Sequence, residues 1–182
     1  MRIVWLYCIL LIATFQAQAG LNSLASLSQE QLRQQVEGSD WYACGEGELR
    51  YCLDEFGYYR LSFYAELVIT ADTVNLTLLA PYSAHQLSEV QLNLRRDGFQ
   101  LDRISIAKES FNVTEALRLA KSTKQRNQVD KALIQFLNRF PQEAVREMDW
   151  THTKWHAILH SDGEMMALTL RPNLERLNDE ID

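Results

Sequence analysis

Two alternating stretches joined by a short turn most constrain the fold of this chain. Between Tyr59 and Ile69 every second side chain is apolar or aromatic, which is the period of a β-strand with one buried face. A turn at Ala71-Asp72 sets this strand against a second alternating stretch. All side chains of the following pairs then share one face: Ile69 with Val74, Leu67 with Leu76 and Ala65 with Leu78. We therefore predict an antiparallel hairpin with one face in the core.

A second hairpin is predicted after a loop. Residues 90–94 alternate between apolar and polar side chains, and Asp97-Gly98 is a dipeptide typical of tight β-turns. In the returning strand, over residues 99–106, the apolar positions change parity. A single extra residue causes such a change, so we predict a β-bulge near Asp102-Arg103.

A last hairpin is predicted near the C-terminus, where Asp162-Gly163 gives the same turn signal. The flanking stretches again alternate between apolar and polar side chains, which indicates two strands with one buried face. The predicted register pairs Leu159 with Met166, Ala157 with Leu168 and Trp155 with Leu170.

Helical signals lie before and between these strands. A short N-terminal helix is expected from the spacing of leucines before Gly38, a natural helix stop. Asn112 precedes Glu115 by three positions, which is the arrangement of a helix N-cap. The clearest helical stripe runs over residues 129–140, with apolar side chains three and four positions apart. Pro141 ends that stripe and is expected to open a short helix that reaches Met148.

Grouped strands followed by grouped helices indicate an α+β fold rather than an alternating α/β fold. We predict an antiparallel sheet of about six strands, four or five followed by a C-terminal hairpin. An N-terminal helix precedes it, and a helical insertion occupies about 113–148. Residues 20–172 are expected to form a single domain, followed by an acidic tail at 173–182. A chain that is 47% hydrophobic and 23% charged is not intrinsically disordered.

The N-terminus has the pattern of a secretory signal peptide over residues 1–19. Arg2 precedes a mostly apolar stretch at 3–15, and Ala17-Gln18-Ala19 is a small-x-small cleavage site. The stretch is shorter than the roughly 20 residues that a membrane-spanning helix needs. We expect cleavage, export to the periplasm or the cell exterior, and no stable membrane insertion afterwards; an uncleaved N-terminal anchor is the alternative.

Two cysteines follow the predicted cleavage site, Cys44 and Cys52. In an oxidising compartment such an isolated pair is typical of a structural disulfide. A redox pair would show C-x-x-C, which this pair does not. A zinc site would need further cysteine or histidine residues nearby in the sequence, and there are none. We predict a disulfide that closes a short loop.

Three of the four histidines, His152, His156 and His160, are spaced four residues apart. On a helix this spacing suits a metal site, whereas on a strand residues four apart lie roughly 13 Å from each other and cannot share an ion. The neighbouring alternation and the Asp162-Gly163 turn favour a strand. We expect the histidines on its less buried face; a metal site and a pH-dependent role are the alternatives.

A candidate recognition surface combines aromatic and acidic residues. Tyrosine and tryptophan offer a large contact area with a polar group, which suits protein recognition. Because alternation assigns Tyr59 and Phe63 to the core, other aromatic side chains are left for the surface. The candidate binding residues are Trp41, Tyr42, Tyr58, Tyr64, Glu46 and Glu48. The alternative is that the aromatic rings fill the faces of the sheet and the acidic residues form a solvated loop.

Function is predicted mainly by exclusion. A net charge of −6 argues against a nucleic-acid binder and suits a basic protein partner. The sequence shows neither a nucleophile elbow nor a phosphate-binding glycine loop. We expect a non-catalytic binding or accessory protein without a cofactor, of the inhibitor, immunity or envelope-assembly type. Alternatives are a carrier that holds an apolar ligand between the sheet and the helix at 129–140, and a hydrolase that these motifs do not reveal.

Overall fold

The computed structural model describes residues 31, 34, 36–37, 39–45, 49–70 and 73–173. The predicted signal peptide, the Ala71-Asp72 turn and nearly all of the predicted acidic tail lie outside these residues. Of the predicted N-terminal helix, the described residues 31, 34, 36 and 37 are helical.

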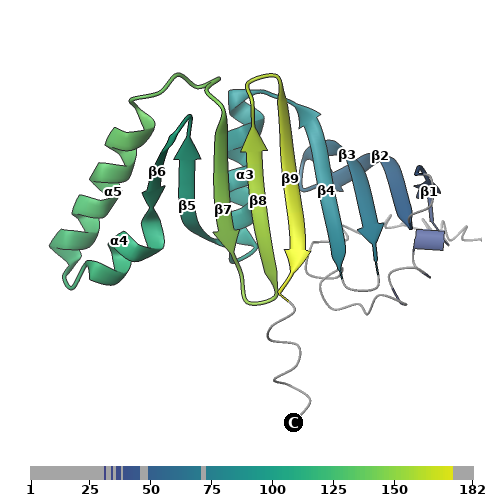
Figure 1. The fold of residues 1–182 in the computed structure, drawn as a ribbon, viewed down its shortest axis with the longest axis horizontal. Helices are drawn as coiled ribbons and strands as arrows, with labels where there is room; N and C mark the ends of the chain where they lie inside the picture. The colour runs from purple at the N-terminus through teal and green to yellow at the C-terminus, as the bar shows by residue number, and fades with distance from the viewer. Residues whose placement is uncertain are drawn as a thin grey trace, which may run out of the picture.

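The strands of the described chain form one nine-stranded sheet, in which every neighbouring pair is antiparallel (Figure 1). The spatial order is β1-β2-β3-β4-β9-β8-β7-β5-β6, so the last of the described strands lies at the centre. The strands are β1 (Tyr42–Ala43), β2 (Arg50–Tyr58), β3 (Leu61–Ile69), β4 (Val74–Pro81), β5 (Gln100–Ile106), β6 (Glu109–Asn112), β7 (Arg146–Thr151), β8 (Trp155–Ser161) and β9 (Met165–Pro172). The α+β class is confirmed, but the prediction of about six strands is wrong.

One face of this sheet is buried beneath helix α3 (Ala84–Arg96), which lies behind the central strands in Figure 1. Three apolar side chains of α3 belong to the same buried cluster as those of the central strands, such as Leu159 and Leu168. Side chains on the opposite face, such as Ile158 and Thr169, are only half-buried. Helices α4 (Val113–Leu119) and α5 (Thr123–Leu137) lie beside the β6 edge instead of covering a face.

The predicted β3–β4 hairpin is confirmed with its register, including the pair Leu67 and Leu76. The C-terminal hairpin forms the predicted strands, but its register differs by two residues, since Leu159 pairs with Leu168. The cause is the turn. The prediction placed Gly163 at the second loop position, but with a φ of 91° it occupies the first, which glycine favours in a type II′ turn. A shift of two preserves parity, and the predicted core side chains on β8 and β9 are buried.

The predicted strand at 90–94 is wrong, because these residues belong to α3. The helix begins at the N-cap Ser83, whose hydroxyl accepts the N–H of Gln86 at 3.0 Å. At Asp97-Gly98 the chain forms a Schellman-type helix end rather than a hairpin: the N–H of Gly98 donates to Arg95 and that of Phe99 to Leu94. The side chains at 90, 92 and 94 alternate as in a strand, but those buried on α3, at 87, 90 and 94, are three and four positions apart, which is the spacing of a helix.

The predicted bulge is confirmed, since the register between β5 and β7 shifts between Leu101 and Arg103. The partner strand differs from the prediction, because β5 pairs with β6 and β7. The short helix predicted from Pro141 to Met148 is also wrong. Residues 146–151 form β7, in which Met148 and Trp150 are buried on the core face and Asp149 between them is buried on the other face.

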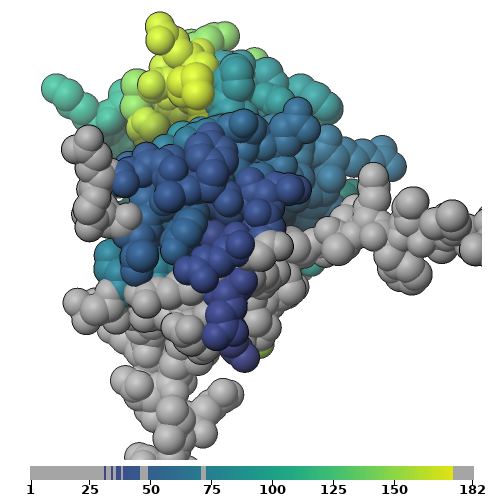
Figure 2. Space-filling view, turned by 90° about the vertical axis from the view of Figure 1, so that its right-hand side faces the viewer, coloured from purple at the N-terminus to yellow at the C-terminus, as the bar shows by residue number. Residues whose placement is uncertain are grey.

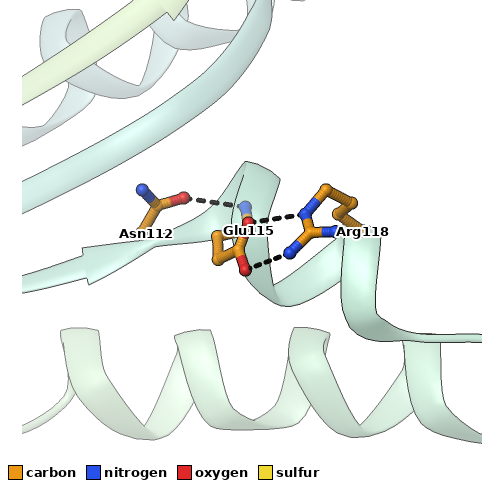
Figure 3. A network of polar contacts seen from close by, with 3 residues as sticks. All are labelled: Asn112, Glu115 and Arg118. Atoms are coloured by element: carbon orange, nitrogen blue, oxygen red, sulfur yellow. Dashed lines mark hydrogen bonds and ion pairs between the residues drawn. The ribbon is translucent and has the colours of Figure 1, made fainter.

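The helical insertion is confirmed at 113–137, but it ends before the predicted 148. Its first helix begins at the predicted cap: Asn112 Oδ1 accepts the N–H of Glu115 at 2.8 Å (Figure 3). The Glu115 carboxylate then accepts two bonds from the Arg118 guanidinium, at 2.7 and 2.6 Å. This pair is exposed, so solvent screens it and it adds little to the stability of the helix.

The difference between the two sheet faces predicts different costs for two neighbouring substitutions. Leu159→Ala removes a fully buried side chain and should lower the free energy of unfolding by about 2–5 kcal/mol. Ile158→Ala, on the half-buried face, should cost less than half of that. Urea unfolding of both variants tests this expectation, and equal costs would contradict the assignment of the buried face.

Candidate functional site

A disulfide fixes the edge strand at one end of the sheet. Cys44 and Cys52 are bonded, as predicted, with their Cα atoms 5.8 Å apart. Strand β1 has only two residues, which pair with β2 as Tyr42 with Cys52 and Ala43 with Tyr51. Two residues form too short a ladder to hold an edge strand alone, so the position of β1 depends on this bond. Figure 2 faces this end of the molecule, where β1 and β2 (blue) form much of the surface.

Tyr42 on β1 is hydrogen-bonded to a carboxylate on β2. Its hydroxyl donates to Asp54 Oδ1 at 2.8 Å. This bond to a carboxylate favours the neutral phenol and raises the pKa of Tyr42 to about 12. Asp54 lies in a bulge of β2, where the register with β3 shifts between Leu53 and Phe56. The bulge places two consecutive exposed carboxylates, Asp54 and Glu55, at the surface.

These carboxylates form one wall of an open groove of about 440 Å³. The groove is lined by residues of four strands: Asp54 and Glu55 from β2, Ser62, Phe63 and Tyr64 from β3, Leu79, Ala80 and Pro81 from β4, and Met165 from β9. We call this surface the acidic groove. It combines an acidic side with aromatic and apolar side chains, among them the exposed Met165. Such a surface suits a cationic group attached to an apolar one.

The structure brings two of the six predicted binding residues to this region. Tyr64 lines the acidic groove, and Tyr42 is bonded to the Asp54 carboxylate at its side. Trp41 is half-buried, with its ring edge-on to Phe56 at 6.2 Å. Glu46 and Glu48 lie outside the described residues.

Tyr58 contradicts the prediction of an exposed side chain, because it is only 3% exposed. Tyr59, which was assigned to the core, is 39% exposed. The reason is the tight β2–β3 turn: Tyr58 pairs with Leu61, so Tyr59 and Arg60 form the two-residue loop. The alternation of β3 therefore does not continue through Tyr59, and the assignments of the two tyrosines are exchanged.

Sequence reasoning missed the apolar part of the acidic groove. Leu79 and Pro81 lie near and at the end of β4, and Met165 begins β9 more than eighty residues later in the chain. The pairing of Pro81 with Met165 brings them together. No local signal predicts that β9 pairs with β4, so this contact could not be found from periodicity alone.

Two of the three histidines lie on the predicted strand, and the prediction is wrong for His152. His156 and His160 are on the half-buried face of β8, and His152 lies in the connection from β7. Among the described residues, no three His, Cys, Asp or Glu side chains are grouped so that they could hold a metal ion. His156 Nε2 is 4.0 Å from Asp149 Oδ1, but this carboxylate is already bonded to Arg103 at 2.9 Å through Nε.

On the side of the sheet that α3 covers, one carboxylate joins the β2–β3 turn to the end of that helix. Asp97 accepts the hydroxyls of both Tyr58, at 2.7 Å, and Tyr59. Burial and the bond to Asp97 raise the pKa of Tyr58 well above its ordinary value. The same carboxylate raises the pKa of Tyr59 to about 12, chiefly through its hydrogen bond. Both phenols therefore remain protonated donors at neutral pH.

Helix α5 does not lie across the sheet as the carrier hypothesis requires. It lies beside β6, where the ring of Phe136 contacts Phe111 at 5.8 Å and Phe140 at 5.4 Å. Phe136 is buried, so this interface is filled by side chains. The packing argues against an apolar cavity between α5 and the sheet.

Comparison with known proteins adds no relative. No family model, no curated protein and no solved structure matches the chain. Within the described residues, none of the helices is both long and apolar enough to cross a membrane.

Removing the disulfide should loosen this end of the sheet. The Cys44→Ser/Cys52→Ser variant should lose about 2–3 kcal/mol of unfolding free energy, because the bond closes a short loop. The backbone N–H at position 44, which donates to Arg50 at 3.2 Å, should exchange faster with solvent. Urea unfolding and hydrogen exchange measure the two effects. Reduction of the wild type should reproduce them, and unchanged stability would contradict the role of the bond.

The tyrosine–aspartate contact predicts a loss of stability at high pH. Above about pH 10 the phenols of the unfolded chain lose their protons, while Tyr58 and Tyr59 keep theirs in the fold. The folded state then binds more protons, so the unfolding free energy falls as the pH rises from 10 towards 12. In urea titrations, Tyr58→Phe should flatten this decline. An unchanged slope would rule out Tyr58 as its source.

Proposed function

We propose that this chain is a non-catalytic binding protein whose recognition surface is the acidic groove. The observation that carries the proposal is the convergence of two exposed carboxylates with aromatic and apolar side chains from four strands. Tyr42 orients one of these carboxylates, and the disulfide keeps Tyr42 in place. A surface held in this way before binding loses little conformational entropy when a partner docks.

The chemistry of the groove indicates the partner. Asp54 and Glu55 favour lysine or arginine, and opposite charges across an interface speed association and select against acidic partners. Tyr64 and Met165 offer contact area to an apolar side chain, and such residues are enriched at protein interfaces. We therefore infer that the partner presents a basic and apolar protein segment, as a secreted basic enzyme or an envelope component would.

The site of action that fits this function is the periplasm or the cell exterior. The Cys44–Cys52 disulfide is stable in an oxidising compartment, and the predicted signal peptide would direct the chain there. Within this setting the binding function is that of an inhibitor, an immunity protein or an accessory of envelope assembly.

Two carboxyl groups of the described chain are stabilised in their ionised form. The pKa values of Glu115 and Asp162 are both shifted downward. The cause is the hydrogen bonds from Arg118 to Glu115 and from backbone N–H groups to Asp162. A general acid needs a carboxyl pKa shifted in the opposite direction. These groups therefore serve structure rather than acid catalysis.

Site-specific crosslinking tests the proposal. A photoreactive residue in place of the exposed Met165 should capture one defined protein in the source cells. Glu55→Lys, which reverses an exposed charge in the groove, should reduce this capture at least tenfold. Asp130→Lys, the same charge change on exposed α5, should leave it unchanged.

A second position controls for nonspecific capture. A photoreactive residue in place of Ile134, which is exposed on α5, should not yield the same product. Capture of the same protein from both positions, or capture that Glu55→Lys does not affect, would refute the acidic groove as the recognition surface.

A further inference from the structure

A second cavity lies between α3 and the β2–β3 turn, and the function proposed above does not use it. Its volume is about 460 Å³, and it is lined by Tyr59, Arg60, Glu89, Asn93 and Arg96. We call it the arginine pocket. Its size is within the range of small-molecule sites, and its lining is polar, in contrast to the apolar side of the acidic groove.

The hydrogen-bonding groups of the arginine pocket are mostly donors. Arg60 and Arg96 form no ion pair among the described residues, although each carries a guanidinium with donors in a fixed geometry. Arg96 donates to Asn93 Oδ1 at 3.4 Å, and its guanidinium carbon lies 6.0 Å from the Tyr59 ring centroid. Two arginines that project from different elements into one cavity match the oxygens of a carboxylate or phosphate.

Asn93 is the least expected residue of the pocket. It lies on the buried side of α3 and is only 1% exposed, yet it is polar. Its carbonyl oxygen bonds Arg96, but its Nδ2 donates to no described residue. This nitrogen is not among the buried polar atoms that lack a hydrogen-bond partner, so solvent in the pocket can reach it. The amide therefore provides a third donor for a ligand in the pocket.

The turn that forms the other wall is strained. Tyr59 has a φ of 57° at the first position of a two-residue hairpin loop, where glycine is usual. Its hydroxyl bond to Asp97 and the neighbouring Arg96 hold it in this conformation. Strained non-glycine residues persist where the surrounding structure enforces them, and they are concentrated at ligand sites.

We propose that the arginine pocket binds a small organic anion through a carboxylate or phosphate group. Arg60, Arg96 and the Asn93 amide hold its anionic oxygens. Glu89 accepts a hydrogen bond from a hydroxyl or ammonium group elsewhere on the same molecule. The inference is independent of the acidic groove, because the two surfaces share no lining residue.

Titrations of the full, disulfide-bonded protein with inorganic phosphate, succinate and glutamate test this site. Nuclear magnetic resonance should show a saturable shift of the Asn93 side-chain amide with at least one of them. The probe that saturates distinguishes phosphate from carboxylate recognition. Tighter binding of glutamate than of succinate is the result expected from Glu89, and Glu89→Gln should remove that preference.

Matched arginine variants provide the control. Arg60→Gln and Arg96→Gln should each weaken binding at least tenfold. Arg95→Gln, which removes the same charge one residue away at the Trp150 ring, should change it less than twofold. Equal weakening by all three would indicate nonspecific charge attraction and overturn the proposal, as would the absence of a saturable shift with every probe. Circular dichroism checks that each variant folds.

Discussion

The burial of a single face of the sheet is the interaction on which this structure depends. Strands β3, β4, β9, β8 and β7 place aliphatic and indole side chains on that face, and α3 covers it. Apolar burial contributes roughly 25 cal/mol per Å², so these residues supply most of the favourable free energy of folding. Because one face carries this role, side chains on the other face and at the ends of the strands are free to vary. Both proposed sites lie at such positions.

The parts of the fold that follow from local periodicity could be predicted from the sequence. The β3–β4 register, the bulge in β5 and the cap at Asn112 each depend on residues close together in the chain, and the structure confirms them. Errors arose where one pattern fits two structures. Val90 and Leu94, four positions apart, fit either a helix or a strand, and only Leu87, three positions before Val90, favours the helix; Asp97-Gly98 ends a helix as readily as it turns a hairpin.

The candidate site was less predictable than the fold, because it depends on strand order. The disulfide and the importance of the tyrosines were accessible from composition and spacing. The contribution of Met165 was not, since it follows from the pairing of β9 with β4. The exposure of Tyr58 was predicted wrongly because a two-residue turn interrupts the alternation between β2 and β3.

Strand β2, which the sequence pattern did not reveal, connects the two proposed sites. It carries the disulfide at Cys52, the acidic bulge at 54–55 and, at its end, Tyr58, which reaches Asp97 across to α3. The same strand therefore contributes to a surface on one face and leads into the turn that lines a pocket on the other. Its irregularity explains why it lacks a clean alternating pattern: a bulge interrupts the strand and a strained turn follows it.

The central position of β9 has a consequence for biosynthesis. Of the described strands the ribosome makes this one last, yet it separates β4 from β8 and links the two halves of the described sheet. Neither half can join the other until residue 172 has emerged, so a growing chain cannot complete its hydrogen-bonded ladder prematurely. Completion of the sheet therefore waits for the contact between β9 and β4, whose strands lie far apart in the sequence, and such long-range pairing is typical of slow folding.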